Sequence, residues 1–132
     1  MTSDQARKII AAGEARAAEI GVPVNIAVLD AGTHLKAFVR MDGAVLGSID
    51  VAMGKARTAA LFQTTSEAVW DYCKPGAPAP SLQLSNGGLM TFAGGIPLTG
   101  ADGTMIGAVG VSGGAVSQDR EIAEAAAAAI GN

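Results

Sequence analysis

The chain has very few of the residues on which cysteine, histidine and aromatic chemistry depends. Its 132 residues include one cysteine and one histidine, and aromatic residues make up 4% of the sequence. A single cysteine excludes a disulfide within the chain, and no cysteine and histidine cluster has the spacing of a zinc site. The few aromatic side chains provide little surface on which bases or sugars could stack.

Charged residues are also scarce, at 16% of the chain, and acidic residues outnumber basic ones. The net charge of −3 and the pI of about 4.9 do not suit a phosphate backbone, which requires clustered Lys and Arg. No apolar run approaches the roughly 18 residues that a membrane helix needs. We therefore expect neither a nucleic-acid partner nor a membrane partner.

Hydrophobic residues, by contrast, make up 49% of the chain, and the mean hydropathy is +0.34, which is apolar for a small domain. Since no membrane segment accounts for this excess, we expect it to be buried between the subunits of a closed homo-oligomer. The first ten residues, MTSDQARKII, do not show the positively charged segment followed by an apolar segment that characterises a signal peptide. A cytoplasmic protein is therefore the expectation.

Hydrophobic periodicity and turn residues predict a single α+β domain over residues 1–132, with the element order α-β-β-α-α-β-β-β-α. Helices are predicted over 2–21, 48–62, 64–73 and 117–132, and strands over 24–30, 34–42, 88–95, 95–100 and 104–113. The turn sequences DAGT and GADG predict hairpins. The sheet, of about five strands, should therefore be antiparallel and packed with the helices.

The predicted helix ends carry capping residues. Thr2 and Gln5 have the spacing of a capping box, and Gly21 can end the first helix in the left-handed conformation. The other N-caps are predicted at Ser48, at Thr64 with Glu67 as its capping-box partner, and at Ser117. Small residues recur at helical spacing along the second helix, which predicts its close approach to a sheet or to another helix.

The sequence GVSGG, residues 110–114, matches the G-x-S-x-G nucleophile elbow of serine hydrolases. That elbow needs a histidine after the serine, whereas the only histidine, His34, lies upstream of Ser112, and the chain is short for that fold. Two interpretations remain for this glycine-rich junction between a strand and a helix. Its backbone N–H groups could bind a carboxylate or phosphate, or the glycines could only make a tight turn.

His34 follows the DAGT turn and shares one face of its predicted strand with Lys36, Phe38 and Arg40. An imidazole can ligate haem iron, and nearby cations can pair with the haem propionates. His34 would then be the iron ligand, with Lys36 and Arg40 near the propionates. The alternative is a solvated polar face on a half-buried strand.

Lys55 lies in the middle of the second predicted helix, on a face rich in Ala, Met and Gly. A buried lysine can have a lowered pKa and act as a base or form a Schiff base. Alternatively, its side chain extends to solvent or pairs with an acid, and Asp50 and Asp119 are candidate partners. The candidates for a carboxylate site are Asp30, Asp42, Asp50 and Asp119.

Four short blocks, DAGTHL, RMDGA, SIDVAMGKA and GAVGVSGG, occur in this order along the chain. Together they resemble the GlcG/HbpS family, which includes the C-terminal domain of PduO-type proteins and is described as haem-binding or haem-degrading. The resemblance implies a compact α+β domain with an antiparallel sheet that assembles into homo-oligomers. It also assigns GVSGG to the strand-to-helix turn of the family.

The resemblance implies, as a first hypothesis, a haem-binding accessory protein. The histidine of the family block DAGGHL corresponds to His34, with Thr33 in place of the second glycine. Other members belong to catabolic gene clusters for glycolate or aromatic acids, which implies a second hypothesis. This is a small cofactor-independent hydrolase, deaminase or tautomerase that acts on a small carboxylate.

The catalytic residues of such an enzyme would be Lys55, Asp119 and Ser112 with its neighbouring amides, together with His34. They could abstract a proton or stabilise an oxyanion. A third hypothesis is a structural oligomer without a small ligand.

Overall fold

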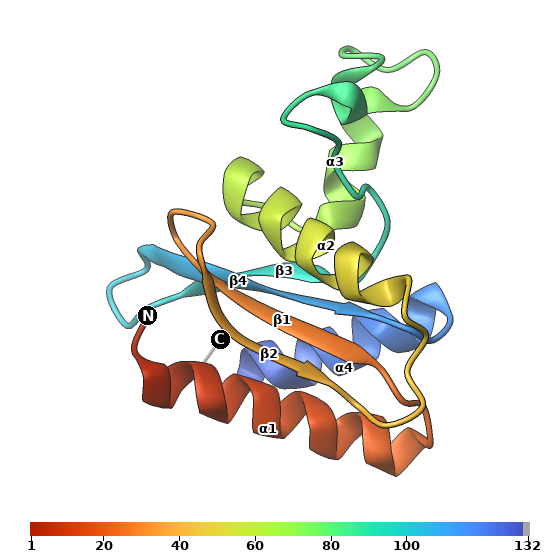
Figure 1. Ribbon diagram of the computed structural model, residues 1–132. Helices are drawn as coiled ribbons and strands as arrows, with labels where there is room; N and C mark the ends of the chain where they lie inside the picture. Colours follow the sequence, from red (N-terminus) through yellow and green to blue (C-terminus); the bar gives the residue numbers. More distant parts are fainter. Residues whose placement is uncertain (131–132) are drawn as a thin grey trace.

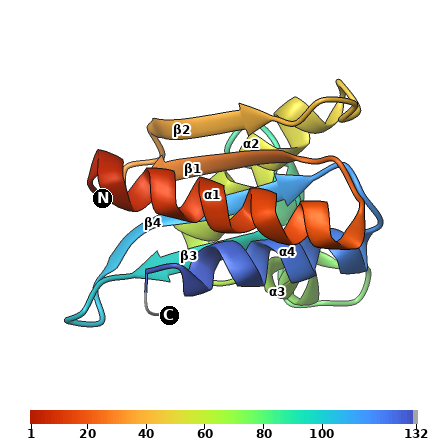
Figure 2. The ribbon, with the colours of Figure 1, turned by 90° about the horizontal axis from the view of Figure 1, so that it is seen from below.

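The computed structural model describes residues 1–130 and shows a four-stranded antiparallel sheet with helices on both faces (Figure 1, Figure 2). The strand order is β2-β1-β4-β3, so β1 and β4 lie in the centre. The elements are α1 (Ser3–Ile20), β1 (Asn25–Asp30), β2 (Leu35–Arg40), α2 (Ser48–Phe62), α3 (Ser66–Cys73), η1 (Leu82–Leu84), β3 (Gly95–Thr99), β4 (Met105–Ser112) and α4 (Val116–Ala128). The predicted α+β class and antiparallel sheet are confirmed, with four strands in place of about five.

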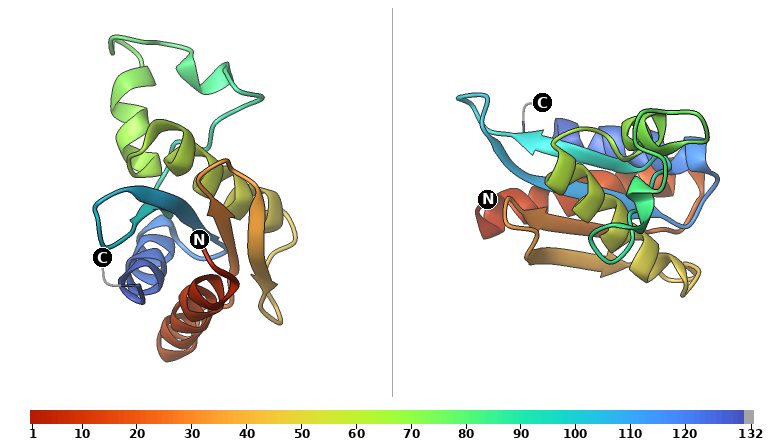
Figure 3. Two further views of the ribbon diagram at one scale, coloured as in Figure 1. Left: turned by 90° about the vertical axis from the view of Figure 1, so that its left-hand side faces the viewer. Right: turned by 90° about the horizontal axis from the view of Figure 1, so that it is seen from above.

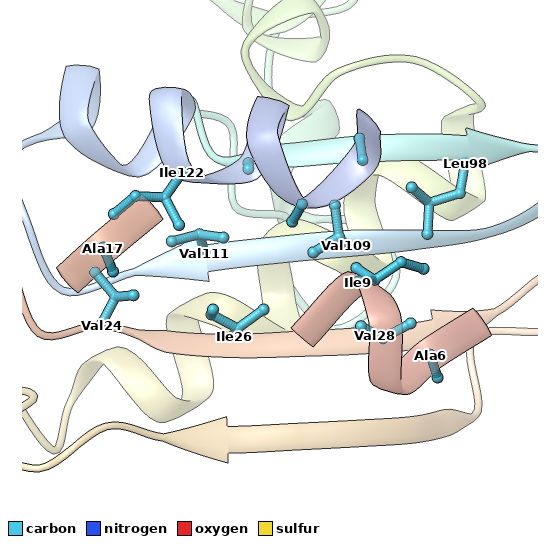
Figure 4. Packing of buried hydrophobic residues seen from close by; sticks show 13 residues of the cluster. Ala6, Ile9, Ala17, Val24, Ile26, Val28, Leu98, Val109, Val111 and Ile122 are labelled. Atoms are coloured by element: carbon cyan, nitrogen blue, oxygen red, sulfur yellow. The ribbon is translucent and has the colours of Figure 1, made fainter. Parts of the chain in front are cut away.

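Strand β1 separates two hydrophobic clusters, because successive side chains of a strand point to opposite faces of the sheet. Ile26 and Val28 belong to the larger cluster, which lies between the sheet and the helices α1 and α4 (Figure 4). Ala27 and Leu29 belong to a smaller cluster under α2, which consists largely of alanine. The two faces of the sheet are therefore packed with side chains of different size.

Small side chains let α2 lie close to the sheet. Gly110 in β4 lies against the turn of α2 that contains Ala52 and Ala56, and a Cβ atom at position 110 would overlap the Ala52 carbonyl oxygen. The predicted close approach of this helix is confirmed, and the element that it approaches is the sheet.

The strand predicted over 88–95 is wrong for all but its last residue, because β3 begins only at the end of that range. The backbone of this segment bonds to side chains of α2 and α3. The Met90 N–H donates to the Thr58 hydroxyl at 3.0 Å, and the Phe92 carbonyl accepts from the Ser66 hydroxyl at 2.7 Å. These bonds hold the segment against the helices, which removes one strand from the predicted sheet.

One of the four predicted N-caps is confirmed. Thr2 and Gln5 form the capping box of α1, and Gly21 ends that helix in the left-handed conformation. The other three N-cap predictions are wrong by one or two residues. The N-caps are Gly47, Thr65 and Ala115 in place of Ser48, Thr64 and Ser117. At α4 side chains from inside the helix supply the acceptors, because Gln118 Oε1 accepts the N–H of the N-cap residue Ala115 and Asp119 Oδ1 accepts the N–H of Gly114 before it, both at 2.9 Å.

The segment that contains α3 and η1 extends away from the sheet as an arm, here defined as residues 66–90 (Figure 1, Figure 3). Several large apolar side chains of the arm are exposed, among them Trp70, Tyr72 and Leu84. None of the helices within residues 1–130 is long and apolar enough to cross a membrane.

The contact between Gly110 and α2 predicts that Gly110→Ala destabilises the protein by about 3 kcal/mol, because the new methyl group overlaps backbone that cannot rotate away. Chemical unfolding in urea measures this free energy. Gly47→Ala is the matched control, since a Cβ atom at position 47 meets nothing within 4 Å. Equal stability of the two variants would contradict the tight contact of α2 with β4.

Candidate functional site

The turn between β1 and β2 holds His34 at the end of the sheet. Asp30, the last residue of β1, organises this turn with its side chain. Its Oδ1 atom accepts hydrogen bonds from the backbone N–H groups of Gly32 and His34, both at 2.9 Å. The imidazole Nδ1 of His34 lies 3.5 Å from the same oxygen, and 83% of the His34 side chain is exposed. The hairpin therefore presents the imidazole to solvent beside a carboxylate.

Hydrogen bonding keeps Asp30 in its charged form. The backbone N–H of His34 lowers the pKa of Asp30 most, and the backbone N–H of Gly32 lowers it further. A carboxylate beside one ring nitrogen orients an imidazole and leaves the other nitrogen free to bind a metal. This arrangement suits a histidine ligand of iron.

The two cations predicted beside His34 lie at different distances from it. Lys36 and Arg40 are both exposed on β2, an edge strand of the sheet. At about 3.3 Å per residue, Lys36 lies about 7 Å along the strand from His34, and Arg40 lies about 20 Å away. Lys36 is therefore the cation close enough to contact a molecule bound to His34.

A second group of polar residues lies inside the protein and joins three elements. Lys55 of α2 extends its Nζ atom to the Val111 carbonyl oxygen of β4 at 2.9 Å and to Asp119 Oδ2 of α4 at 3.0 Å. The same Nζ lies 4.7 Å from the centre of the Phe92 ring. Lys55 has no exposed side-chain surface, and 3% of the Asp119 side chain is exposed. Of the two candidate partners for Lys55, the structure selects Asp119.

Burial acts on both members of this pair. Loss of water lowers the pKa of Lys55 and raises the pKa of Asp119, because each charged form is less favourable in the interior. The Gly114 N–H bond and the contact with Lys55 favour the charged form of Asp119, and the Asp119 charge favours protonated Lys55. With these partners at hydrogen-bond distance, the two side chains form a buried ion pair at neutral pH.

The glycine-rich junction after β4 binds a carboxylate of the protein itself. The Gly114 N–H donates to Asp119, so the anion at this strand-to-helix turn is a side chain of α4. Ser112 is buried and pairs across the sheet with Asn25 at the start of β1, whereas His34 follows the opposite end of β1. His34 and Ser112 thus lie at opposite ends of the sheet, and the structure does not bring them together.

The structure therefore divides the residues predicted to be functional into an exposed group at the β1–β2 turn and a buried group around Lys55, and it leaves Arg40 apart from both at the far end of β2. Within residues 1–130, no three acidic, histidine or cysteine side chains are placed to hold a metal ion. The four candidate aspartates do not converge on one site.

Comparison with known proteins places the chain in a family. A family model described as haem degrading protein, HbpS-like, matches residues 1–128. The chain belongs to the HbpS-like family. A 15.0 kDa protein of Citrobacter freundii, encoded in the dhaT-dhaS intergenic region, is 42% identical over 127 residues, which cover 96% of this chain and 89% of that protein.

A longer relative is the corrinoid adenosyltransferase PduO of Salmonella typhimurium. It is 41% identical over 117 residues, which cover 87% of this chain and 34% of PduO. The chain therefore corresponds to about a third of that enzyme.

Two solved structures share the fold over nearly the whole chain. The Klebsiella pneumoniae protein ORFY has a TM-score of 0.94 and 35% identity, over 98% of this chain and 90% of its own. The PduOC complex with haem has a TM-score of 0.92 and 35% identity, over 99% of this chain and 95% of its own. The resemblance to the GlcG/HbpS family is confirmed.

Sequence reasoning missed three partners of the buried pair, which are the Val111 carbonyl, the Phe92 ring and the Gly114 N–H. Phe92 lies in a segment that was expected to be a strand, and its ring covers Lys55 only because that segment lies against the helices. Gly114 lies in the sequence GVSGG, for which anion binding and a tight turn both remained open. No feature of the sequence showed that the Asp119 carboxylate would accept the Gly114 N–H. A glycine-rich turn followed by an aspartate five residues later was the available signal.

The buried pair predicts a strong coupling between its two members. Asp119→Ala should lower the free energy of unfolding by about 3–5 kcal/mol, because it leaves Lys55 buried without a counter-charge. Lys55→Met combined with Asp119→Ala should cost less than the sum of the two single variants. Urea unfolding of all four proteins measures the coupling, and strictly additive costs would show that the two side chains do not form an ion pair.

Proposed function

We propose that this protein binds haem, with His34 as the ligand of the iron. The observation that carries the proposal is the exposed imidazole beside the Asp30 carboxylate, at the end of the β1–β2 hairpin. Support comes from the family description, which names haem degradation, and from the haem complex of PduOC, which shares 35% of its residues with this chain. Bound haem would supply an iron centre for ligand binding or electron transfer.

The residues at the hairpin fit a haem group chemically. Asp30 would orient the imidazole through Nδ1 and leave Nε2 to face the iron. Lys36, the nearer cation on β2, would pair with a propionate. In this role Asp30 is a positioning residue, whereas His34 contacts the cofactor itself.

A porphyrin at this place would lie on the outer surface of the protein. The cavity nearest the turn, which Thr33 and Leu29 help to line, has a volume of about 230 Å³. Sites for drug-sized ligands have roughly 300–1,000 Å³. Leu35, next to His34, is 53% exposed and offers apolar surface outside the cavity. The porphyrin would therefore lie outside this cavity, and we propose that a second copy of the chain covers it.

Self-association also accounts for the exposed apolar residues of the arm. Tyr72 and Leu84 are 59% and 76% exposed, and apolar surface of this kind is typical of protein contacts. We expect light scattering to give a mass that is a multiple of 13.1 kDa. Leu84→Ser should lower that mass or weaken the assembly on dilution. A chain that stays monomeric at all concentrations would contradict the proposal of a homo-oligomer.

A haem titration, followed in the Soret region, tests the function. The protein should show a saturable Soret shift, and His34→Ala should weaken haem binding by at least tenfold because the iron loses its ligand. Asp30→Asn should weaken binding by about 10–100-fold and alter the spectrum, since it removes the partner that orients the ring.

The control for this titration is Lys8→Ala, which removes an exposed lysine of α1, outside the arm. Its titration should match that of the unaltered protein. A Soret shift of the same size and midpoint in His34→Ala would exclude His34 as the iron ligand.

A further inference from the structure

A small cavity of about 230 Å³ lies between α2, the β1–β2 turn and the segment after η1. Figure 3 shows that segment, the last part of the arm, returning towards the sheet beside α2. It is held there by Arg57, whose Nη1 atom donates to the Asn86 carbonyl oxygen. Neither the buried ion pair nor His34 lines this cavity, so its lining serves neither of the groups described above.

Two residues of opposite charge lie on the cavity wall. Asp50 and Arg57 are seven residues apart on α2, which places both on one face of the helix, about 10.5 Å apart along its axis. Among the ion pairs of residues 1–130, none joins Asp50 to Arg57. A guanidinium has five N–H donors, and its bond to Asn86 leaves donors for a ligand.

The wall between these charges is apolar and depends on the absence of a side chain at Gly54. Met53 and Met90 line the cavity with Gly54, and Met90 packs directly over that glycine. A Cβ atom at position 54 would come within 2.5 Å of Met90 Cγ. The glycine therefore leaves room for the Met90 side chain in its place on the cavity wall, and a methyl group there would displace it.

Thr33 forms the wall on the side of the hairpin, and its backbone is in the left-handed region with φ of 70°. A β-branched residue is rare in this conformation, and such strain costs on the order of 1–3 kcal/mol. Glycine would adopt the same turn without this cost. The threonine thus adds a branched side chain to the cavity wall at the expense of stability.

We propose that this cavity binds a small carboxylate that carries a hydrogen-bond donor at its other end. Arg57 would pair with the carboxylate, because the planar guanidinium matches the geometry of that group. Asp50 would accept a hydrogen bond from the hydroxyl or ammonium group of the ligand. The same Asp50 charge would repel a second carboxylate, so the site discriminates against dicarboxylates.

Methionine methyl groups report binding directly. In protein labelled with ¹³C at the methionine methyl groups, 4-hydroxybutanoate and 4-aminobutanoate should shift the Met53 and Met90 signals in a saturable way. Met1 and Met41 pack against the larger hydrophobic cluster on the other side of the sheet, and their signals should not move. Succinate and 4-hydroxybutanamide should bind at least tenfold more weakly, since one adds a second carboxylate and the other lacks the charge.

Variants distinguish binding in this cavity from other causes of a change in the methionine methyl signals. Arg57→Gln should weaken binding of 4-hydroxybutanoate at least tenfold, and Gly54→Ala should also weaken it, because the new methyl group displaces Met90 from its place on the cavity wall. Arg7→Gln is the matched control, since Arg7 is exposed and pairs with Asp4 on α1, and it should leave binding unchanged. His34→Ala should also leave it unchanged, so this proposal and the haem proposal succeed or fail separately.

Several results would overturn the proposal. They are equal shifts with 4-hydroxybutanamide, shifts that persist in Arg57→Gln, equal movement of the Met1 and Met41 signals, and no saturable shift with either carboxylate up to its solubility limit.

Discussion

The arrangement of this protein depends on one buried ion pair. Lys55 reaches from α2 across the sheet and meets Asp119 of α4 and the Val111 carbonyl of β4, away from water. Because an uncompensated charge in the interior is costly, the three elements must keep this relative position once the pair is formed. The glycines near the end of β4 leave room for the turn that delivers Asp119 to this point.

The position of α2 in turn determines the surroundings of two exposed features, the cavity beside Arg57 and the β1–β2 turn that precedes His34. Alanine and glycine at its contact with the sheet let the helix lie close to β1 and β4. Its outward face then forms one wall of the cavity that holds Asp50 and Arg57, and the β1–β2 turn closes the opposite wall. The histidine follows that turn directly, so the proposed haem ligand and the proposed carboxylate site are neighbours without sharing a side chain.

Much of the fold could be predicted from local patterns, and the errors share one cause. Periodicity placed the four helices and the strands β1, β2, β3 and β4, because alternation and helical spacing are properties of the chain itself. The expected strand before β3 failed because the hydroxyls of Thr58 and Ser66 bond to its backbone. The N-cap of α4 lies two residues before the predicted one, and Gln118 Oε1, from within the helix, accepts the N–H of the N-cap residue Ala115. In each case a hydrogen-bond partner, either far away in the sequence or inside the following helix, overrode the conformation that the local sequence favours.

The sequence by itself determined the class of fold, the hairpin that carries His34 and the family to which the chain belongs, since these depend on residue spacing and turn chemistry. Only the tertiary structure decided that Lys55 pairs with Asp119 and not with Asp50, and that the Asp119 carboxylate occupies the glycine-rich turn after β4. It also decided that a cavity exists beside Arg57. Pairing, distance and enclosed volume arise when separate elements pack together, and no periodicity within one element specifies them.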